Sequence, residues 1–267
     1  MPEGPEVKRI GESLAKHFSN KKIVDIELLS GRYLKKEPSG FSDIKSELPI
    51  SVVGAGVHGK FIFFICENEW SIWNTLGMTG TWSNQKSKHS RIKFTLNDSV
   101  VFYNDMRNFG TFKFVKGKFE LIKKLNSLGP DMLSNPPTDE VFIDIMRKKK
   151  EWTLAKALMN QSVVSGVGNY IKADALWLSK LSPHRFIKDC SASELATLNS
   201  SIQSVMNESY KSGGATIKSY KNFEGEIGNY SEKMLVYGRK TDAHGNEVIK
   251  ETTQDGRTTH WVPCIQK

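Results

Sequence analysis

The sequence predicts an α+β multidomain protein, because the spacing of its apolar residues changes three times along the chain. A helical period marks residues 5–18, and strand-like segments rich in Ile, Val, Phe and Trp follow to about residue 116. Helical periodicity returns from 151 to about 211, and residues 234–267 again have the pattern of strands. We therefore expect an amino-terminal helix, an antiparallel β-sandwich or barrel, a helical domain and a small carboxyl-terminal β unit.

The first helix is expected to begin at Pro5, which suits a first helical turn, and Glu6 suits the positive end of that helix. Its apolar residues fall three and four positions apart and form a single stripe. Pro2 and Glu3 therefore lie immediately before the amino terminus of a helix. The stripe consists of Val7, Ile10, Leu14 and Phe18.

The predicted strands are short and are separated by Gly, Asn, Asp and Ser, which favours antiparallel pairing. Three prolines within 129–138 mark a linker, a glycine-rich loop is expected at 213–230, and Asp255-Gly256 is typical of a hairpin turn. The expected domains are 1–130, 151–230 and 231–267, with the linker at 131–150. The strand segments are 23–29, 60–66, 70–75, 91–96, 100–103, 111–115, 247–252 and 257–262.

The formal net charge of +9 favours a polyanionic partner, although charge alone leaves an ordinary basic protein equally open. The opening residues lack the regions of a signal peptide, and the longest apolar run, Phe61 to Cys66, is too short to span a bilayer. The odd, widely spaced Cys66, Cys190 and Cys264 form no disulfide framework. We expect a soluble monomer in a reducing compartment.

The amino terminus is the first candidate for chemistry. Removal of Met1 would expose the secondary amine of Pro2, and α-amino groups have a pKa near 7.7–8.0, so part of the population is nucleophilic at neutral pH. Attack on a carbonyl-like carbon would give an iminium, with Glu3 beside it as general acid or base. The competing interpretation is an ordinary solvated terminus.

Lys60 and the segment 166–169 are two further candidates. Lys60 follows a glycine-rich loop containing Gly54, Gly56 and Gly59, and could handle a proton or contact phosphate. Gly-Val-Gly-Asn at 166–169 lies between two predicted helices, Thr153–Gln161 and Asn169–Ser179, with Asn169 as a cap and free amides for a phosphate. An ordinary lysine and a plain helical connection are the alternatives.

Arg257 directly follows the predicted hairpin turn, where it could grip a phosphate or be a simple surface charge. Residues 76–80 and 105–110 are loops that display apolar and basic side chains, which could enter a base stack when a nucleotide is extruded. The alternative for their Met and Phe residues is burial in the core.

Together these features resemble the Fpg/Nei family, which comprises formamidopyrimidine-DNA glycosylase and endonuclease VIII. The resemblance runs from Pro2 to Gln266 and implies a catalytic β-sandwich, a helix-two-turn-helix DNA-binding domain and a carboxyl-terminal finger. The matching segments are PEGPEV at 2–7, LGMTG at 76–80, DMRNFGTF at 105–112, LGPDML at 128–133, QSVVSGVGNYIKADAL at 161–176, GG at 213–214, VYGRK at 236–240 and GRTTHW at 256–261.

The resemblance implies a bifunctional glycosylase and AP lyase that removes oxidised bases from damaged double-stranded DNA in base excision repair. In this reading Pro2 attacks the deoxyribose C1′, Glu3 is the acid/base, Lys60 handles a proton and Arg257 assists the second elimination. The resemblance implies DNA contacts at Asn169, Lys156, Lys149, His89, Arg107 and Arg257. The residues implied to fill the space left by the extruded base are Met78, Arg107 and Phe109. The acids implied to support the site are Glu6 and Asp174.

The carboxyl-terminal finger departs from the family pattern. Relatives carry four zinc-binding cysteines there, whereas the matching positions here are His244, Glu247, Val262 and Ile265. Two of those side chains cannot bind zinc, so the sequence predicts a zincless finger with no metal or other cofactor. We expect it to be held by packing of Val248, Trp261 and Val262.

Two questions stay open from the sequence. A catalytically inactive relative that only binds damaged DNA is the alternative function, and the retention of Pro2, Glu3 and Lys60 argues against it. Met78, Arg107, Phe109 and the full-length 213–230 loop resemble the formamidopyrimidine branch, which prefers oxidised purines, and we favour these substrates. The PEGPE segment and a zincless finger also occur in endonuclease VIII-like relatives, which prefer oxidised pyrimidines. The protein is expected inside the cell, where DNA is (the nucleus, or the cytoplasm and nucleoid), and is not expected to be secreted.

Overall fold

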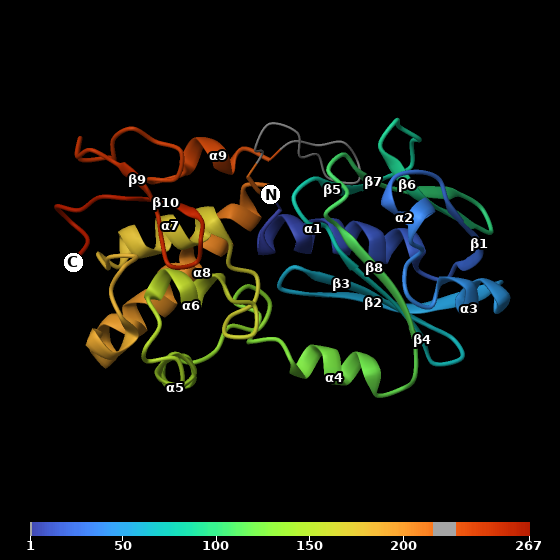
Figure 1. Ribbon diagram of the computed structural model, residues 1–267, viewed down its shortest axis with the longest axis horizontal. Coiled ribbons are helices and arrows are strands. Elements are labelled where there is room, and N and C mark those ends of the chain that lie inside the picture. The colour runs from blue at the N-terminus through green and yellow to red at the C-terminus, as the bar shows by residue number, and fades with distance from the viewer. Residues whose placement is uncertain (1, 216–227) are drawn as a thin grey trace. The chain divides into compact units, whose positions relative to one another are not determined.

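The computed structural model describes residues 2–215 and 228–267, and its chain divides into two compact units (Figure 1). The first unit holds Met1–Pro2, Glu6–Asn126 and Gly213–Gly228, and the second holds Glu3–Pro5, Ser127–Ser212 and Asn229–Lys267. The predicted glycine-rich loop at 213–230 falls mostly outside the described residues.

The first unit is built from helix α1 (Gly4–Phe18) and an eight-stranded sheet. The strand order is β5-β7-β6-β1-β2-β3-β4-β8, and every neighbouring pair is antiparallel. The strands are β1 (Lys22–Leu28), β2 (Ile50–His58), β3 (Phe61–Cys66), β4 (Trp70–Thr75), β5 (Gly80–Ser83), β6 (Ser90–Leu96), β7 (Val100–Asp105) and β8 (Thr111–Lys116); the short helices are α2 (Arg32–Lys35), α3 (Phe41–Ser46) and α4 (Glu120–Asn126).

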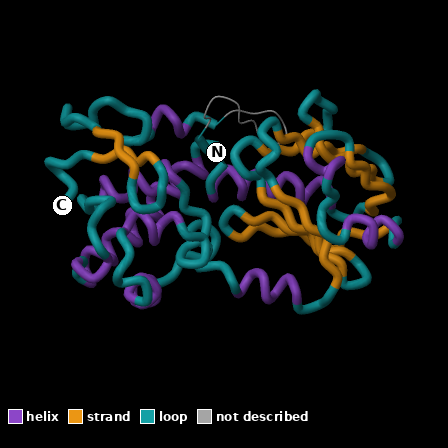
Figure 2. The backbone as a smooth tube through the Cα atoms, in the orientation of Figure 1, coloured by secondary structure: helices purple, strands orange, loops and turns teal. Residues whose placement is uncertain are grey.

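The sheet folds into a sandwich because β1 and β2 share only two residue pairs, Lys22 with Ser51 and Ile23 with Ile50. Aromatic rings from the two halves meet between the layers. Trp82 of β5 lies 5.6 Å from Phe112 of β8, measured between ring centroids. Figure 2 shows the eight strands of this sheet in orange, apart from the two of the carboxyl-terminal hairpin. The predicted antiparallel sandwich is confirmed.

Strand β2 corrects the sequence analysis, which assigned Gly54 and Gly56 to a loop. Both glycines lie within the strand, and Gly56 pairs with Phe63 of β3. A Cβ at Gly56 would lie 2.5 Å from Cζ of Phe63, so the glycine leaves room for that ring. Glycine therefore serves packing inside a strand here instead of ending it.

The second unit consists of helices and one hairpin. Its long helix α8 begins with a capping box, in which Ser191 accepts from the amide of Glu194 and Glu194 accepts from the amide of Ser191. The elements are α5 (Asp139–Arg147), α6 (Leu154–Met159), α7 (Asn169–Leu178), the 3-10 helix η1 (Ile187–Asp189), α8 (Ala192–Lys211), α9 (Tyr230–Lys233), β9 (Ile249–Thr252) and β10 (Thr258–Trp261).

The segment 131–150, predicted as a linker, is partly helical. Helix α5 packs on α8 and buries Phe142 and Met146 completely. Its amino end is capped by Thr138, whose hydroxyl accepts from the amide of Val141. The prolines before Thr138 stop the chain from being helical earlier, but they do not prevent the amphipathic stretch that follows from packing.

Candidate active site

Glu3 is joined to the amino end of α7, the central helix of the second unit. Its carboxylate accepts hydrogen bonds from the backbone amides of Tyr170 at 3.0 Å and Ile171 at 3.3 Å, and the residue is 2% exposed. Two amide donors and the positive end of the helix stabilise the ionised carboxylate. The helix end that the sequence analysis left open for a DNA phosphate is therefore occupied by Glu3.

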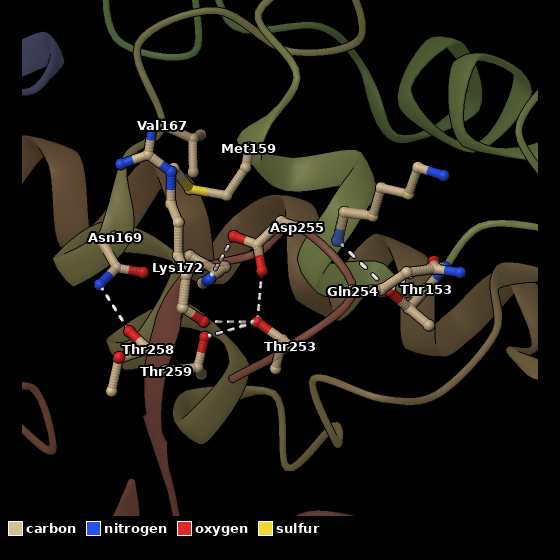
Figure 3. A network of polar contacts seen from close by, with 12 residues as sticks. Thr153, Met159, Val167, Asn169, Lys172, Thr253, Gln254, Asp255, Thr258 and Thr259 are labelled. Carbon is tan, nitrogen blue, oxygen red and sulfur yellow. Dashed lines mark hydrogen bonds and ion pairs between the residues drawn. The ribbon is translucent and has the colours of Figure 1, made fainter. Parts of the chain in front are cut away.

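The turn before α7 is shaped around this carboxylate. Gly168 is the N-cap residue, and a Cβ there would lie 2.1 Å from Cδ of Glu3. The predicted cap at Asn169 is wrong, because Asn169 is already the first helical residue. Its side-chain amide instead donates to the carbonyl of Thr258 in β10 at 2.8 Å (Figure 3).

Arg257 lies at the predicted hairpin, between β9 and β10, and is exposed. The turn is closed by hydrogen bonds between Thr253 and Arg257 and between Gly256 and Thr253. Gly256 has a φ of 71°, a conformation that suits glycine. The sequence pattern Asp-Gly thus placed this turn and its arginine correctly.

Pro2 and Lys60 belong to the first unit. Pro2 is buried, and Lys60 is partly exposed in the tight turn that joins β2 to β3. Gly59 supplies the positive φ of that turn, 58°. The lysine therefore stands at a strand end, as the sequence predicts.

The loops that carry the predicted space-filling residues are exposed, in agreement with the prediction and against burial in the core. Met78 is 39% and Phe109 is 51% exposed, and the Arg107 guanidinium lies 4.7 Å from the centroid of the Phe109 ring. Both loops belong to the first unit.

Asp105 holds these two loops together and is a functional residue that the sequence did not indicate. Asp105 is 1% exposed and accepts hydrogen bonds from the Thr79 hydroxyl, the Gly110 amide at 2.7 Å and the Arg107 amide at 3.2 Å. A carboxylate at the end of a strand, before a loop with glycine, was the available signal.

The predicted DNA-contacting lysines of the second unit share one aromatic neighbour. The Nζ atoms of Lys149 and Lys156 lie 5.1 Å and 4.7 Å from the centroid of the Trp152 ring. Each contact holds a cation at the protein surface. His89, in the first unit, is partly exposed in the loop before β6.

The two supporting acids hold backbone segments in place. Asp174 accepts from the amides of Leu235, Val236 and Tyr237, and burial raises the pKa of its carboxyl although these donors oppose the shift. Glu6 accepts from the amide of Ala215 at 2.7 Å within the first unit.

Of the four positions that match zinc ligands in relatives, Val262 and Ile265 belong to an apolar cluster, whereas His244 and Glu247 are exposed. Val262 is fully buried with Val236, Val248 and Ala173, and Ile265 packs against them, while the His244 ring stacks on Trp177. Within 2–215 and 228–267, no three His, Cys, Asp or Glu residues are grouped to hold a metal ion. The residues present do not fit the tetrahedral site that zinc needs.

Family models match nearly the whole chain. They are the formamidopyrimidine-DNA glycosylase N-terminal domain over residues 1–112, its H2TH domain over 128–221 and its C-terminal domain over 226–267. The formamidopyrimidine-DNA glycosylase of Shouchella clausii is 31% identical over 275 residues, which cover 100% of this chain and 99% of the relative. That of Lactococcus lactis subsp. lactis is 31% identical over 286 residues, covering 100% of both.

Solved structures agree with the family models. A complex between a Lactococcus lactis Fpg mutant and DNA containing Fapy-dG has a TM-score of 0.88 at 26% identity, with 100% of both chains covered. The wild-type Lactococcus lactis enzyme with DNA containing an oxidised pyrimidine has a TM-score of 0.86 at 26% identity and the same coverage. Among the described residues, none of the helices combines the length and apolar character needed to cross a membrane.

The antiparallel sandwich, the H2TH unit and the Glu3 carboxylate at the head of α7 together define a DNA glycosylase of base excision repair. The chain belongs to the formamidopyrimidine-DNA glycosylase family. The bound DNA in the related structures makes damaged DNA the partner of this fold.

Proposed function

We propose that this chain excises an oxidised base and then cleaves the DNA strand, with the Pro2 amine as nucleophile. The observation that carries the proposal is the Glu3 carboxylate, which follows Pro2 directly and is fixed by two amides of α7. A fixed anion next to the amine can take the proton that the nitrogen loses as it bonds to C1′. AP lyase activity is typical of the family to which the chain belongs.

Protein side chains and the amino terminus supply the nucleophile and the proton transfers of the proposed reaction, and no step in it uses a metal ion or changes an oxidation state. Pro2 bonds to C1′ as the base departs, and Glu3 passes the accepted proton to the ring oxygen when the sugar opens. The resulting iminium acidifies C2′, and Glu3, again a carboxylate after it protonates the ring oxygen, accepts the C2′ proton as β-elimination breaks the C3′–O bond. Loss of the C4′ proton to solvent then breaks the C5′–O bond in δ-elimination, so both phosphates leave. Lys60 is proposed to handle a proton of the leaving base, and Arg257 to grip phosphate during the second elimination.

The test traps the covalent intermediate. Borohydride reduction on abasic or 8-oxoguanine duplex should give a protein–DNA adduct, since the iminium is reducible. Replacement of Pro2 by Gly, or retention of Met1, should abolish trapping or reduce it sharply. Replacement of Glu3 by Gln should slow base release by about 10²–10⁴-fold, the usual contribution of a general acid or base.

Glu12 offers a matched control, because Glu12→Gln changes a partly exposed carboxylate of α1, the helix that begins directly after Glu3. It should trap like the unmodified chain. Mass spectrometry of the intact protein establishes in parallel that Met1 is absent from the sample. A chain without Met1 that binds damaged duplex and never traps would instead be an inactive damage-binding relative.

We infer that oxidised purines are the preferred lesions. The support is the exposed trio Met78, Arg107 and Phe109, which resembles that of the formamidopyrimidine branch, whose members prefer oxidised purines. A panel of 8-oxoguanine, formamidopyrimidine and thymine glycol duplexes tests this, and faster excision of thymine glycol would reverse the assignment. The substrate locates the activity where the cell keeps its DNA.

We further infer that the carboxyl-terminal hairpin needs no zinc. The apolar cluster around Val262 supports this, because a hydrophobic core replaces metal bonds in holding a small unit together. Chelator treatment should leave both the melting temperature and the excision rate unchanged, and elemental analysis should find less than one zinc per chain. Stoichiometric zinc whose removal lowers the melting temperature would contradict the inference.

A further inference from the structure

Helix α7 carries a lysine that has no role in the proposed reaction. Lys172 is completely buried, and its Nζ donates to Oδ2 of Asp255 at 2.9 Å in an ion pair whose side chains are 0% and 4% exposed (Figure 3). Asp255 lies in the β9–β10 turn, two residues before Arg257. The pair therefore fastens the Arg257 turn directly to α7 within the second unit.

Two more hydrogen bonds fasten the same turn. The side-chain oxygen of Gln254 accepts from the amide and hydroxyl of Thr153, the N-cap residue of α6, at 3.2 Å each. The hydroxyl of Thr253 donates to the second oxygen of Asp255, so both oxygens of that carboxylate are occupied. The turn is thus held at two adjacent helices (Figure 3).

Stability alone gives little reason for this arrangement. The cost of removing two charges from water commonly equals or exceeds their attraction, and well-packed apolar replacements are often neutral or stabilising. Burial lowers the pKa of the Lys172 ammonium, whereas Asp255 and Glu3 oppose the shift. The pair does fix the orientation of the Arg257 turn on α7, because a charged pair in a buried site tolerates few geometries.

We propose that Lys172 is a positioning residue, which fixes the Arg257 turn relative to the Glu3 carboxylate. Both groups are attached to the same end of one helix: Glu3 by the amides of Tyr170 and Ile171, and the turn by Lys172. The inference rests on the proposed function, since Arg257 is the group that would grip phosphate.

The decisive variant removes both charges. Lys172→Met with Asp255→Asn leaves no unpaired buried charge, and Asn keeps an acceptor for Thr253 and the preference of this position for a turn. We expect a melting temperature close to that of the unmodified chain. Affinity for damaged duplex should fall about ten- to hundredfold, as for one lost charge-assisted hydrogen bond.

Two readouts separate positioning from a structural role. The slope of log affinity against log salt should become shallower by about 0.9, the value for one phosphate contact. The product mixture should shift from δ- towards β-elimination, while borohydride trapping persists. Lys188→Met is the matched control, because it breaks an exposed pair with Glu151 in the same unit, and it should change neither readout.

A folded double variant with an unchanged salt slope and unchanged product ratio would overturn the proposal. If the double variant does not fold, Lys172→Gln with Asp255→Asn applies the same criterion, because it also removes both charges and keeps polar groups that can hydrogen-bond at the two positions. Failure of the unmodified chain to trap would refute the proposed function itself. Normal trapping with no effect of either variant would refute only the role of Lys172.

Discussion

Glu3 combines two tasks in one side chain. Helix α7 has no side-chain cap of its own, because its N-cap residue is Gly168. Glu3 supplies the missing acceptor from 167 residues away along the chain. A cap of this kind stabilises a helix by about 0.5–2 kcal/mol. A proposed catalytic carboxylate therefore also stabilises the second unit, so melting temperatures should accompany all kinetic data on Glu3 variants.

His260 makes the stability of the second unit sensitive to acid. It is 8% exposed in β10 with its ring 4.8 Å from that of Tyr237, and burial, Lys250 and Lys172 lower its pKa from the ordinary 6.5. The unfolded chain therefore takes up a proton first as pH falls below 6.5. The contribution of His260 to stability is therefore expected to be largest above pH 6.5 and to decline as pH falls until the folded state also protonates, by up to about 1.4 kcal/mol per pH unit.

His260→Phe keeps an aromatic ring and removes this titration. Urea unfolding between pH 7.5 and 5 should show a shallower loss of stability for this variant than for the unmodified chain. Nδ1 of His260 has no partner within the described residues, so Phe leaves no group unpaired there. Identical pH slopes for the two proteins would show that His260 does not carry the effect.

At the scale of elements, Asp105 makes two loops behave as one. The loop with Met78 and the loop with Arg107 and Phe109 leave different strands, yet both are bonded to this buried carboxylate. Arg91 adds a further constraint, because its Nε donates to the carbonyl of Asp105 at 2.7 Å. The two loops that carry the three proposed space-filling residues are therefore bonded to one carboxylate in the structure without DNA.

Asp105→Asn should loosen that arrangement. Replacing one acceptor oxygen by NH₂ leaves at least one of the loop donors unpaired, which should cost about 1–3 kcal/mol of stability. Base extrusion, followed by stopped-flow fluorescence of 2-aminopurine beside the lesion, should become slower. Asp98→Asn alters an exposed carboxylate of the same unit and is the control. Extrusion at the unmodified rate would show that the loops do not need Asp105.

At the scale of the whole molecule, the sequence predicted the order of helix, sandwich, helical domain and hairpin because each produces a repeating pattern of burial. The sequence did not predict β2, because its glycines indicated a loop, whereas Gly56 lies in the strand and leaves room for the Phe63 ring. It did not predict α5, because prolines precede a helix that packing on α8 stabilises. Such choices depend on neighbours that are distant in sequence.

The candidate site depends even more than the fold on contacts between residues that are distant in sequence. Asp-Gly and the loop motifs indicated Arg257, Met78 and Phe109 correctly as displayed residues. Lys172 and Asp255 are separated by 83 residues and lie in two different motifs, and nothing in either motif indicates that the two side chains meet. Only the fold brings them together, so they could not be found from spacing.

The absence of a side chain at Gly168 has a consequence for genetics. Any larger residue there would displace the Glu3 carboxylate, since its Cβ would fall 2.1 Å from Cδ. In a mutational screen for repair, this position would score like a catalytic residue although it donates no atom to the reaction. A mutational map of the chain would then show the same loss of repair for substitutions at Gly168, where a side chain has no room, as for substitutions of the residues that react.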